Sequence, residues 1–217
     1  MERRGNGQPP QGVTHLDYFE AIESPLRRAA YEALNKVRSP LPNEQRSLEG
    51  IGWVFLPVHA KSLVQVARET PDYFEFITGA EGPRNYVPPE MTAAIHPEHL
   101  ALRNSYGRRP DDQLFMIEKL SQYVQRELPD ARALMLPASA IAQLVIAFQE
   151  KTGRNPIGGF YVRGLDQAGM MSGPIRRFTI VGHEESKSKK LIVDTTPDIG
   201  GFPDIAALPA VIFVRSK

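Results

Sequence analysis

Residues 132–164 read RALMLPASAIAQLVIAFQEKTGRNPIGGFYVRG and decide the expected fold, because every local signal in them agrees. A short apolar run is ended by Pro137, which has no N–H for a sheet ladder, so a strand is predicted to stop there. Ser139 fits a helix N-cap, and Gly153 can adopt the positive φ that ends a helix. Between them, apolar side chains recur at the spacing of one helical face: Ile141, Leu144, Val145 and Phe148.

A second extended segment follows this predicted helix. Asn155-Pro156 favours extended backbone, and residues 160–162, Phe-Tyr-Val, suit a buried pleated surface. The stretch 132–164 therefore predicts a β-α-β unit with a right-handed parallel crossover.

The rest of the chain predicts further helices and strands on both sides of this unit. Helical periodicity marks residues 14–22, 25–37, 61–69 and 111–128. Strands are expected at 51–58, with both faces covered, at 178–181 and 191–193, which form a hairpin, and at 210–214. The expected fold class is α+β: a single mixed β-sheet of about six strands flanked by helices, with an antiparallel C-terminal part.

Composition favours one domain with a flexible start. Residues 1–12 are rich in Gly, Pro, Gln and Arg without periodicity, so we expect a disordered tail, followed by a single α+β domain over 14–217. The chain has 217 residues and 41% hydrophobic content, enough for a sizeable core. Its 26 basic and 25 acidic residues leave a net charge of +1, which gives no global attraction to nucleic acid or anionic lipid.

Several chemistries are excluded by what the chain lacks. With no cysteine it can form neither disulfides nor thiolate metal sites, and no cysteine nucleophile is possible. We expect no cofactor and no metal. The N-terminal residues carry arginines without an apolar region after them, and no apolar run approaches the ~20 residues of a membrane span, so a cytoplasmic protein is expected.

Three residues are candidates for catalysis: Ser139, His183 and Asp194. Ser139 follows a strand and starts a helix, as a nucleophile on a strand-turn-helix does, although an N-cap explains it equally. His183 precedes two glutamates and could act as a general acid or base, and Asp194 falls near a predicted strand end, where α/β enzymes often keep ligands. A solvated hairpin tip and an ordinary turn explain these two residues without catalysis.

The candidate binding residues are three arginines and two methionines: Arg163, Arg176, Arg177, Met170 and Met171. The arginines, with lysines of the hairpin tip, could form a basic face for phosphate or RNA, but glutamates dilute this charge. The methionines could form an adaptable contact patch in the loop after Gly164. His96 and His99 have a spacing that can share a metal on a helix, yet Pro97 between them favours a structural or surface role.

These patterns favour a non-catalytic protein-interaction or assembly module of unknown function, with a protein partner or self-association and no membrane contact. The alternative is a small-molecule-binding domain or hydrolase-like enzyme, with a site near the loops after Leu136, Gly164 and Asp194. A second alternative is RNA or nucleotide binding through the C-terminal third, which carries ten basic and six acidic residues from Lys151 onward, although nucleic acid is the less expected partner. The sequence leaves open whether the chain is an enzyme.

Overall fold

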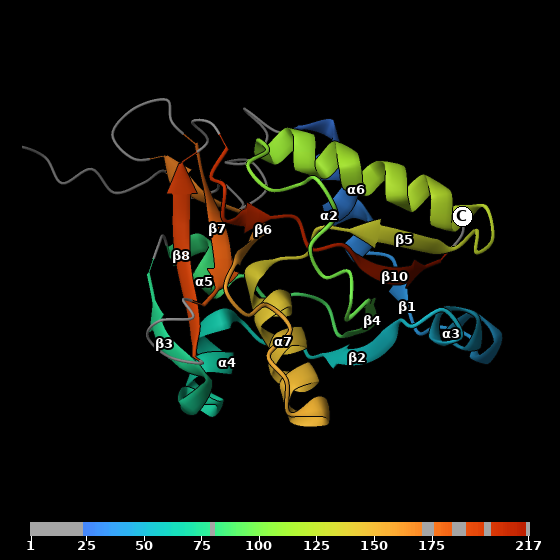
Figure 1. Cartoon of the computed structure of the whole chain (residues 1–217), viewed down its shortest axis with the longest axis horizontal. Helices are drawn as coiled ribbons and strands as arrows, with labels where there is room; N and C mark the ends of the chain where they lie inside the picture. The colour runs from blue at the N-terminus through green and yellow to red at the C-terminus, as the bar shows by residue number, and fades with distance from the viewer. Residues whose placement is uncertain (1–23, 79–80, 171–175, 184–189, 198–200, 216–217) are drawn as a thin grey trace, which may run out of the picture.

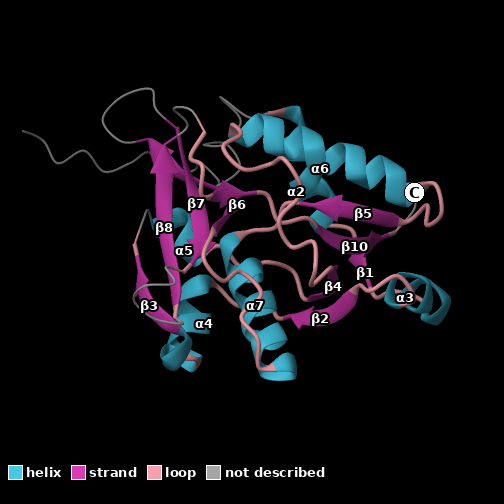
Figure 2. Cartoon of the chain, in the orientation of Figure 1, coloured by secondary structure: helices cyan, strands magenta, loops and turns pink. Residues whose placement is uncertain are grey.

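The structure of the protein, a computed structural model, describes residues 24–78, 81–170, 176–183, 190–197 and 201–215. These residues form two β-sheets that lie side by side, with helices packed between and around them (Figures 1 and 2). The α+β class is therefore confirmed, whereas the expected single sheet is wrong. The expected tail at 1–12, the helix at 14–22, the hairpin tip and Met171 lie outside the described residues.

The first sheet, sheet A, is built around the C-terminal strand β10 (Ala210–Val214), in which all five residues are buried. Antiparallel pairing joins β10 to β5 (Ala131–Leu134) along one edge. Along its other edge it pairs with both β1 (Val37–Arg38) and β4 (Met91–Ile95). Strand β2 (Val54–Val58) pairs with β4 and ends the sheet. The hydrophobic stretch predicted at 210–214 is therefore a central strand.

The second sheet, sheet B, has the order β3-β8-β7-β6-β9. Its middle is the predicted hairpin, now seen as antiparallel strands β7 (Arg176–Gly182) and β8 (Leu191–Pro197). Strand β6 (Tyr161–Met170) pairs antiparallel with β7 and parallel with the short β9 (Ile205–Ala206). Strand β3 (Phe74–Ile77) pairs parallel with β8 at the opposite edge.

Helix α7 (Ala138–Thr152) packs between the two sheets and contacts β2 of sheet A as well as β6 and β7 of sheet B (Figure 1). It ends as predicted, with Gly153 at φ 70°. Because the strands before and after this helix, β5 and β6, belong to different sheets, the expected parallel β-α-β unit is wrong. The local signals predicted the elements of residues 132–164, but each strand has its partners elsewhere in the chain.

The other helices cover the outer surfaces. Helix α6 (Pro110–Gln125) lies over β5 and begins with two acidic residues, as the sequence predicted. The remaining helical segments are α2 (Pro25–Leu34), α3 (Pro42–Glu49), α4 (Leu63–Glu69), the short 3-10 turn η2 (Pro71–Tyr73) and α5 (Glu81–Asn85). No helix in the described part of the chain is long and apolar enough to cross a membrane.

Several predicted boundaries need correction. Ser139 is not the N-cap of α7: Pro137 holds that position, and the serine lies in the first turn. The loops expected after Gly164 and Asp194 are parts of strands β6 and β8. Residues 51–58 are not a strand with both faces covered, because β2 starts at Val54 and leaves Pro57 exposed at the edge of its sheet.

Candidate functional site

The three candidate catalytic residues are not joined to one another by hydrogen bonds. Ser139 is 1% exposed, and its Oγ has no hydrogen-bond partner. His183 follows β7, where its Nδ1 accepts the backbone N–H of Gly159 at 3.1 Å. Asp194 accepts the N–H of Thr195 at 2.7 Å and the hydroxyl of Thr78. A serine nucleophile needs a base within hydrogen-bond reach, and neither His183 nor Asp194 provides one for Ser139.

The candidate binding arginines also do not form one exposed face. Arg163 is fully buried, with its Nε donating to Oε1 of Gln113 at 2.8 Å and its guanidinium 5.7 Å from the ring centre of Phe178. Arg177 is half-buried in β7. Met170 and Arg176 pair across the end of β6 and β7, and their side chains are outside the described part of the structure.

A buried polar cluster surrounds Asp166 at the start of α7. Asp166 is 3% exposed, and its Oδ2 accepts the backbone N–H of Ala138 at 2.5 Å. The hydroxyl of Tyr31 lies 3.5 Å from its other oxygen. The first N–H groups of a helix have no partner within the helix, and the carboxylate accepts a hydrogen bond from one of them. Asp166 lies 28 residues after Ala138 in the chain.

Burial raises the pKa of Asp166 to about 6, because loss of water disfavours the charged form. The N–H of Ala138 and the charge of Arg27 act in the opposite direction but are outweighed. The same surroundings raise the pKa of Tyr86 to about 12, through burial first and the charge of Asp166 second.

A strongly shifted pKa often marks a functional group. Here, however, the oxygens of Asp166 are occupied by Ala138 and Tyr31, and the residue is closed off from solvent. Arg27, only 2% exposed, completes the cluster by donating to the carbonyl of Leu165 at 2.7 Å and stacking 4.2 Å from the ring centre of Phe178. This arrangement joins α2, sheet B and the start of α7, so it suits a structural role.

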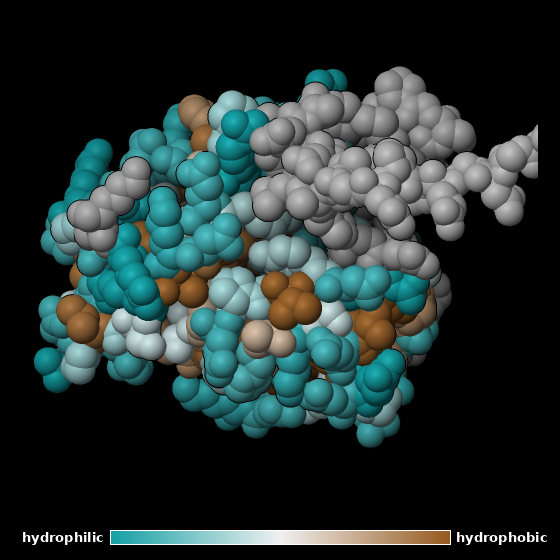
Figure 3. Space-filling view, turned by 180° about the vertical axis from the view of Figure 1, so that it is seen from behind, coloured by the Kyte–Doolittle hydropathy of each residue, from teal (hydrophilic) through white to brown (hydrophobic). Residues whose placement is uncertain are grey.

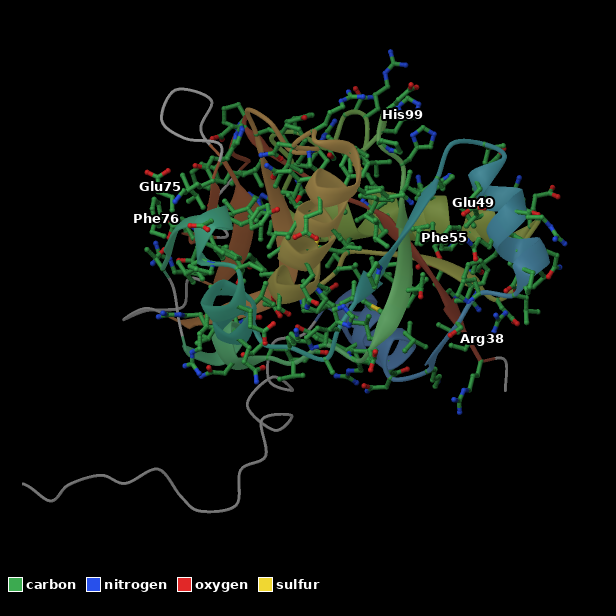
Figure 4. The ribbon with its side chains drawn as sticks, turned by 90° about the horizontal axis from the view of Figure 1, so that it is seen from below. Arg38, Glu49, Phe55, Glu75, Phe76 and His99 are labelled. Carbon is green, nitrogen blue, oxygen red and sulfur yellow. The ribbon has the colours of Figure 1, made fainter. Side chains whose placement is uncertain are left out.

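An open hollow of about 720 Å³ lies at the other end of the molecule, and we call it the α3–α6 groove. His99, which lines it, is labelled in Figure 4 and lies far from Glu75 and Phe76. Its lining is predominantly apolar, and its residues come from α3, the turn into β2, the loop after β4 and α6. They are Ser47, Leu48, Ile51, Trp53, His96, His99, Ala101, Leu102, Arg103, Leu120, Tyr123, Val124, Glu127, Leu128 and Pro209.

One wall of the groove is a row of three aromatic rings. Trp53, the chain's single tryptophan, meets His96 edge-to-face at 5.7 Å, and His96 stacks on His99 at 4.6 Å. His96 Nε2 also lies 3.1 Å from the carbonyl oxygen of Ile51, within hydrogen-bond distance. Gly52 has a φ of 93°, and an added Cβ would stand 3.0 Å from the His96 ring, so glycine is needed in this turn.

The opposite wall is the second half of α6. Leu114 and Ile117 of this helix are buried, whereas Leu120 and Val124, one turn apart, are only half-buried and line the groove. Tyr123 stands beside them and is 66% exposed, as is Ile51 across the groove. The apolar surface of α6 is thus wider than its packing on sheet A requires, and the excess faces solvent. By contrast, the face in Figure 3 shows hydrophobic residues as separate patches among hydrophilic ones.

The two histidines do not have the geometry of a metal pair. Their rings stack at an angle of 29°, which places the nitrogen lone pairs in nearly parallel planes instead of directing them to one point. Nε2 of His96 already lies against the carbonyl of Ile51. Among the residues that the structure describes, no group of three or more His, Asp or Glu side chains could hold a metal ion.

Sequence reasoning missed this groove, although two signals for it were present. The apolar positions of residues 111–128 include Leu120, Val124 and Leu128 in addition to the buried residues, so the predicted face was broad. Residues 42–49 form helix α3, where Pro42 suits the first helical turn and Glu44 accepts the N–H of Leu41 at 2.7 Å. The sequence of this segment shows no helical face, because Leu48 is its only large apolar side chain apart from Pro42.

Comparisons with protein-family models, with curated proteins and with solved structures found no match to this chain.

Proposed function

We propose that this protein is a non-catalytic protein-interaction module that binds an amphipathic helix of a partner in the α3–α6 groove. The observation that supports this proposal most directly is the exposure of Ile51 and Tyr123, each 66%, on either side of an apolar hollow of about 720 Å³. Exposed apolar surface that is grouped and rimmed by polar residues is typical of protein contact sites. Tyrosine and tryptophan, both present here, are the residue types most often responsible for binding energy at interfaces.

The form of the groove favours a helix as the occupant. Its lining follows α6 from Leu120 to the helix end at Gln125, about 8 Å at 1.5 Å per residue, and continues beyond the helix to Leu128. An amphipathic helix presents side chains at i, i+3 or i+4 and i+7 over about this length, and such helices bind apolar grooves between helices. The groove is open to solvent, so the side chains of a bound helix can reach its floor.

The proposal is tested with a phage-displayed library of amphipathic helical peptides that is selected against the full-length protein. Selected peptides are then measured by titration calorimetry on Tyr123→Ala and Ile51→Ala, two changes at exposed positions that leave the core intact. Each substitution is expected to weaken binding by about tenfold or more, because it removes exposed apolar contact area from a wall of the groove. Phe115→Ala is the matched control, since Phe115 is 52% exposed on the same helix but does not line the groove.

Three outcomes count against the proposal. One is a library that yields no peptide whose binding depends on Tyr123 or Ile51, and another is equal loss on Phe115→Ala. The third is a dimer in light scattering that becomes a monomer in Tyr123→Ala, since the groove would then hold a second copy of the chain. The catalytic alternative draws less support, because the hydroxyl of Ser139 is buried without a hydrogen-bond partner, while His183 and Asp194 bond to other residues.

A further inference from the structure

The apolar lining of the α3–α6 groove includes two charged side chains of opposite sign, Arg103 and Glu127. Both are exposed, and neither forms an ion pair with any of the residues that the structure describes. Some charges elsewhere in the described residues are engaged: Arg38 binds both Glu44 and Asp130, and Lys61 binds Glu69. The two charges of the groove are therefore available to a bound partner.

Arg103 and Glu127 are the only lysine, arginine, aspartate or glutamate residues among those that line the groove. Arg103 shares the lining with His96 and His99, side chains that carry no negative charge. Glu98 lies in the same loop but does not line the groove. Glu127 follows the C-terminal end of α6, a helix of 16 residues, where the macrodipole adds partial negative charge.

We infer that the partner helix carries an acidic residue that pairs with Arg103 and a basic residue that pairs with Glu127. This inference rests on the proposed function and adds the charge pattern of the partner. A purely apolar ligand would leave both groove charges without a partner while it displaced water from them, at a cost in free energy. An amphipathic helix can satisfy both, since charges flank its apolar stripe. Such complementary charges fix the orientation of the helix and exclude partners of the wrong pattern.

The test uses the groove-binding peptides selected from the library, with Arg103→Glu and Glu127→Lys as variants. Arg103→Glu is expected to weaken binding by about tenfold, and the loss should be regained when the acidic residue of the peptide is changed to lysine. Glu127→Lys should behave in the same way toward a basic residue of the peptide. Binding to the unchanged protein should also weaken as salt is raised from 50 to 500 mM, since screening shortens the reach of exposed charges.

Two matched controls keep the result specific. Arg108→Glu changes an exposed arginine of the same loop that bonds to the carbonyl of Asn104 and does not line the groove. Glu118→Lys reverses a charge on α6 at a residue that accepts a hydrogen bond from Gln122 and does not line the groove. Peptides that depend on Tyr123 yet bind Arg103→Glu and Glu127→Lys unchanged, or that are weakened equally by the controls, overturn the inference. The groove function stands in that case, so the two failures are distinguishable.

Discussion

Helices α3 and α7 both begin with a carboxylate that accepts a backbone N–H, yet the two carboxylates have opposite pKa shifts. At α3, Glu44 accepts the N–H of Leu41 and forms a two-bond ion pair with Arg38 at 2.6 and 2.8 Å. Those direct bonds outweigh burial and lower its pKa. At α7, burial outweighs all other influences and raises the pKa of Asp166 to about 6. A guanidinium in direct bidentate contact thus decides the sign at one helix start, and loss of water decides it at the other.

The largest expected effect comes from removing the acceptor at α7. Asp166→Ala leaves the N–H of Ala138 without its partner and removes a negative charge near Arg27, in a region closed to water. We expect a loss of about 3–5 kcal/mol in the free energy of unfolding, measured by urea denaturation at pH 4, where the contribution of this group is largest. Glu44→Ala should cost about 1–2 kcal/mol, since Arg38 keeps Asp130 as a partner when Glu44 is removed. A smaller loss for Asp166→Ala than for Glu44→Ala would contradict the comparison.

The second prediction concerns pH and follows from the two opposite shifts. The folded pKa of Asp166, about 6, lies above its unfolded value of about 3.9, so the stability from this group is fully present below pH 4 and lost as pH rises through 6. The free energy of unfolding is expected to fall by on the order of 3 kcal/mol, because the folded and unfolded pKa values of Asp166 differ by about two and each unit is worth about 1.4 kcal/mol. It is measured as the difference in unfolding free energy between the wild type and Asp166→Asn at pH 4 and pH 7.

For Glu44, the lowered pKa gives the opposite direction. The contribution of Glu44 to the free energy of unfolding is present above its unfolded pKa of about 4.3 and is lost as the pH falls below that value. The wild type should therefore lose stability relative to Glu44→Gln on acidification from pH 6 to pH 3. If both differences moved in the same direction with pH, burial and pairing would not be the causes of the two shifts.

The same two helix starts explain how much of the fold could be read from the sequence. The Gly153 end of α7, the periodicity of 138–152, the hairpin strands and the apolar strand β10 are local signals, and local patterns predict elements well. The acceptor for Ala138 comes from 28 residues away on β6, and no local pattern indicates such a partner. Ser139 looked like the cap because serine prefers that position, while Asp166 fulfils the role.

Pairing between distant strands was also beyond local reasoning. Residues 132–164 contain a strand, a helix and a strand, which predicts a parallel unit, yet β5 pairs with β10 and β6 pairs with β7. The groove was missed for a similar reason. Its aromatic wall joins Trp53 to His96 and His99, which β2 and β4 bring together by pairing over a long separation in sequence. Periodicity shows which residues are apolar but not which of them remain uncovered.

A third prediction concerns the cation at α3. Arg38→Met retains an apolar stem against Phe213, over which the guanidinium now lies at 5.3 Å, but removes the bonds to Glu44 and Asp130. We expect a loss of about 1–2 kcal/mol by thermal and urea unfolding, a modest value because the network is partly exposed. The variant should also bring the pKa of Glu44 back toward its ordinary value, which NMR titration of the carboxyl carbon measures. An unchanged titration would show that Arg38 is not the cause of the shift.

The smallest expected effect, at Ser139, separates a true cap from a residue that only resembles one. If Ser139 were the N-cap of α7, Ser139→Ala would cost about 1 kcal/mol, as the loss of a capping hydroxyl does. In the structure the hydroxyl is buried without a hydrogen-bond partner, so folding removes its water without giving it a new bond. Replacing serine with alanine removes this cost to the folded state. Ser139→Ala is therefore expected to leave stability unchanged or raise it by up to about 1 kcal/mol in urea unfolding. A clear destabilisation would restore the capping role to Ser139 and weaken the assignment of that role to Asp166.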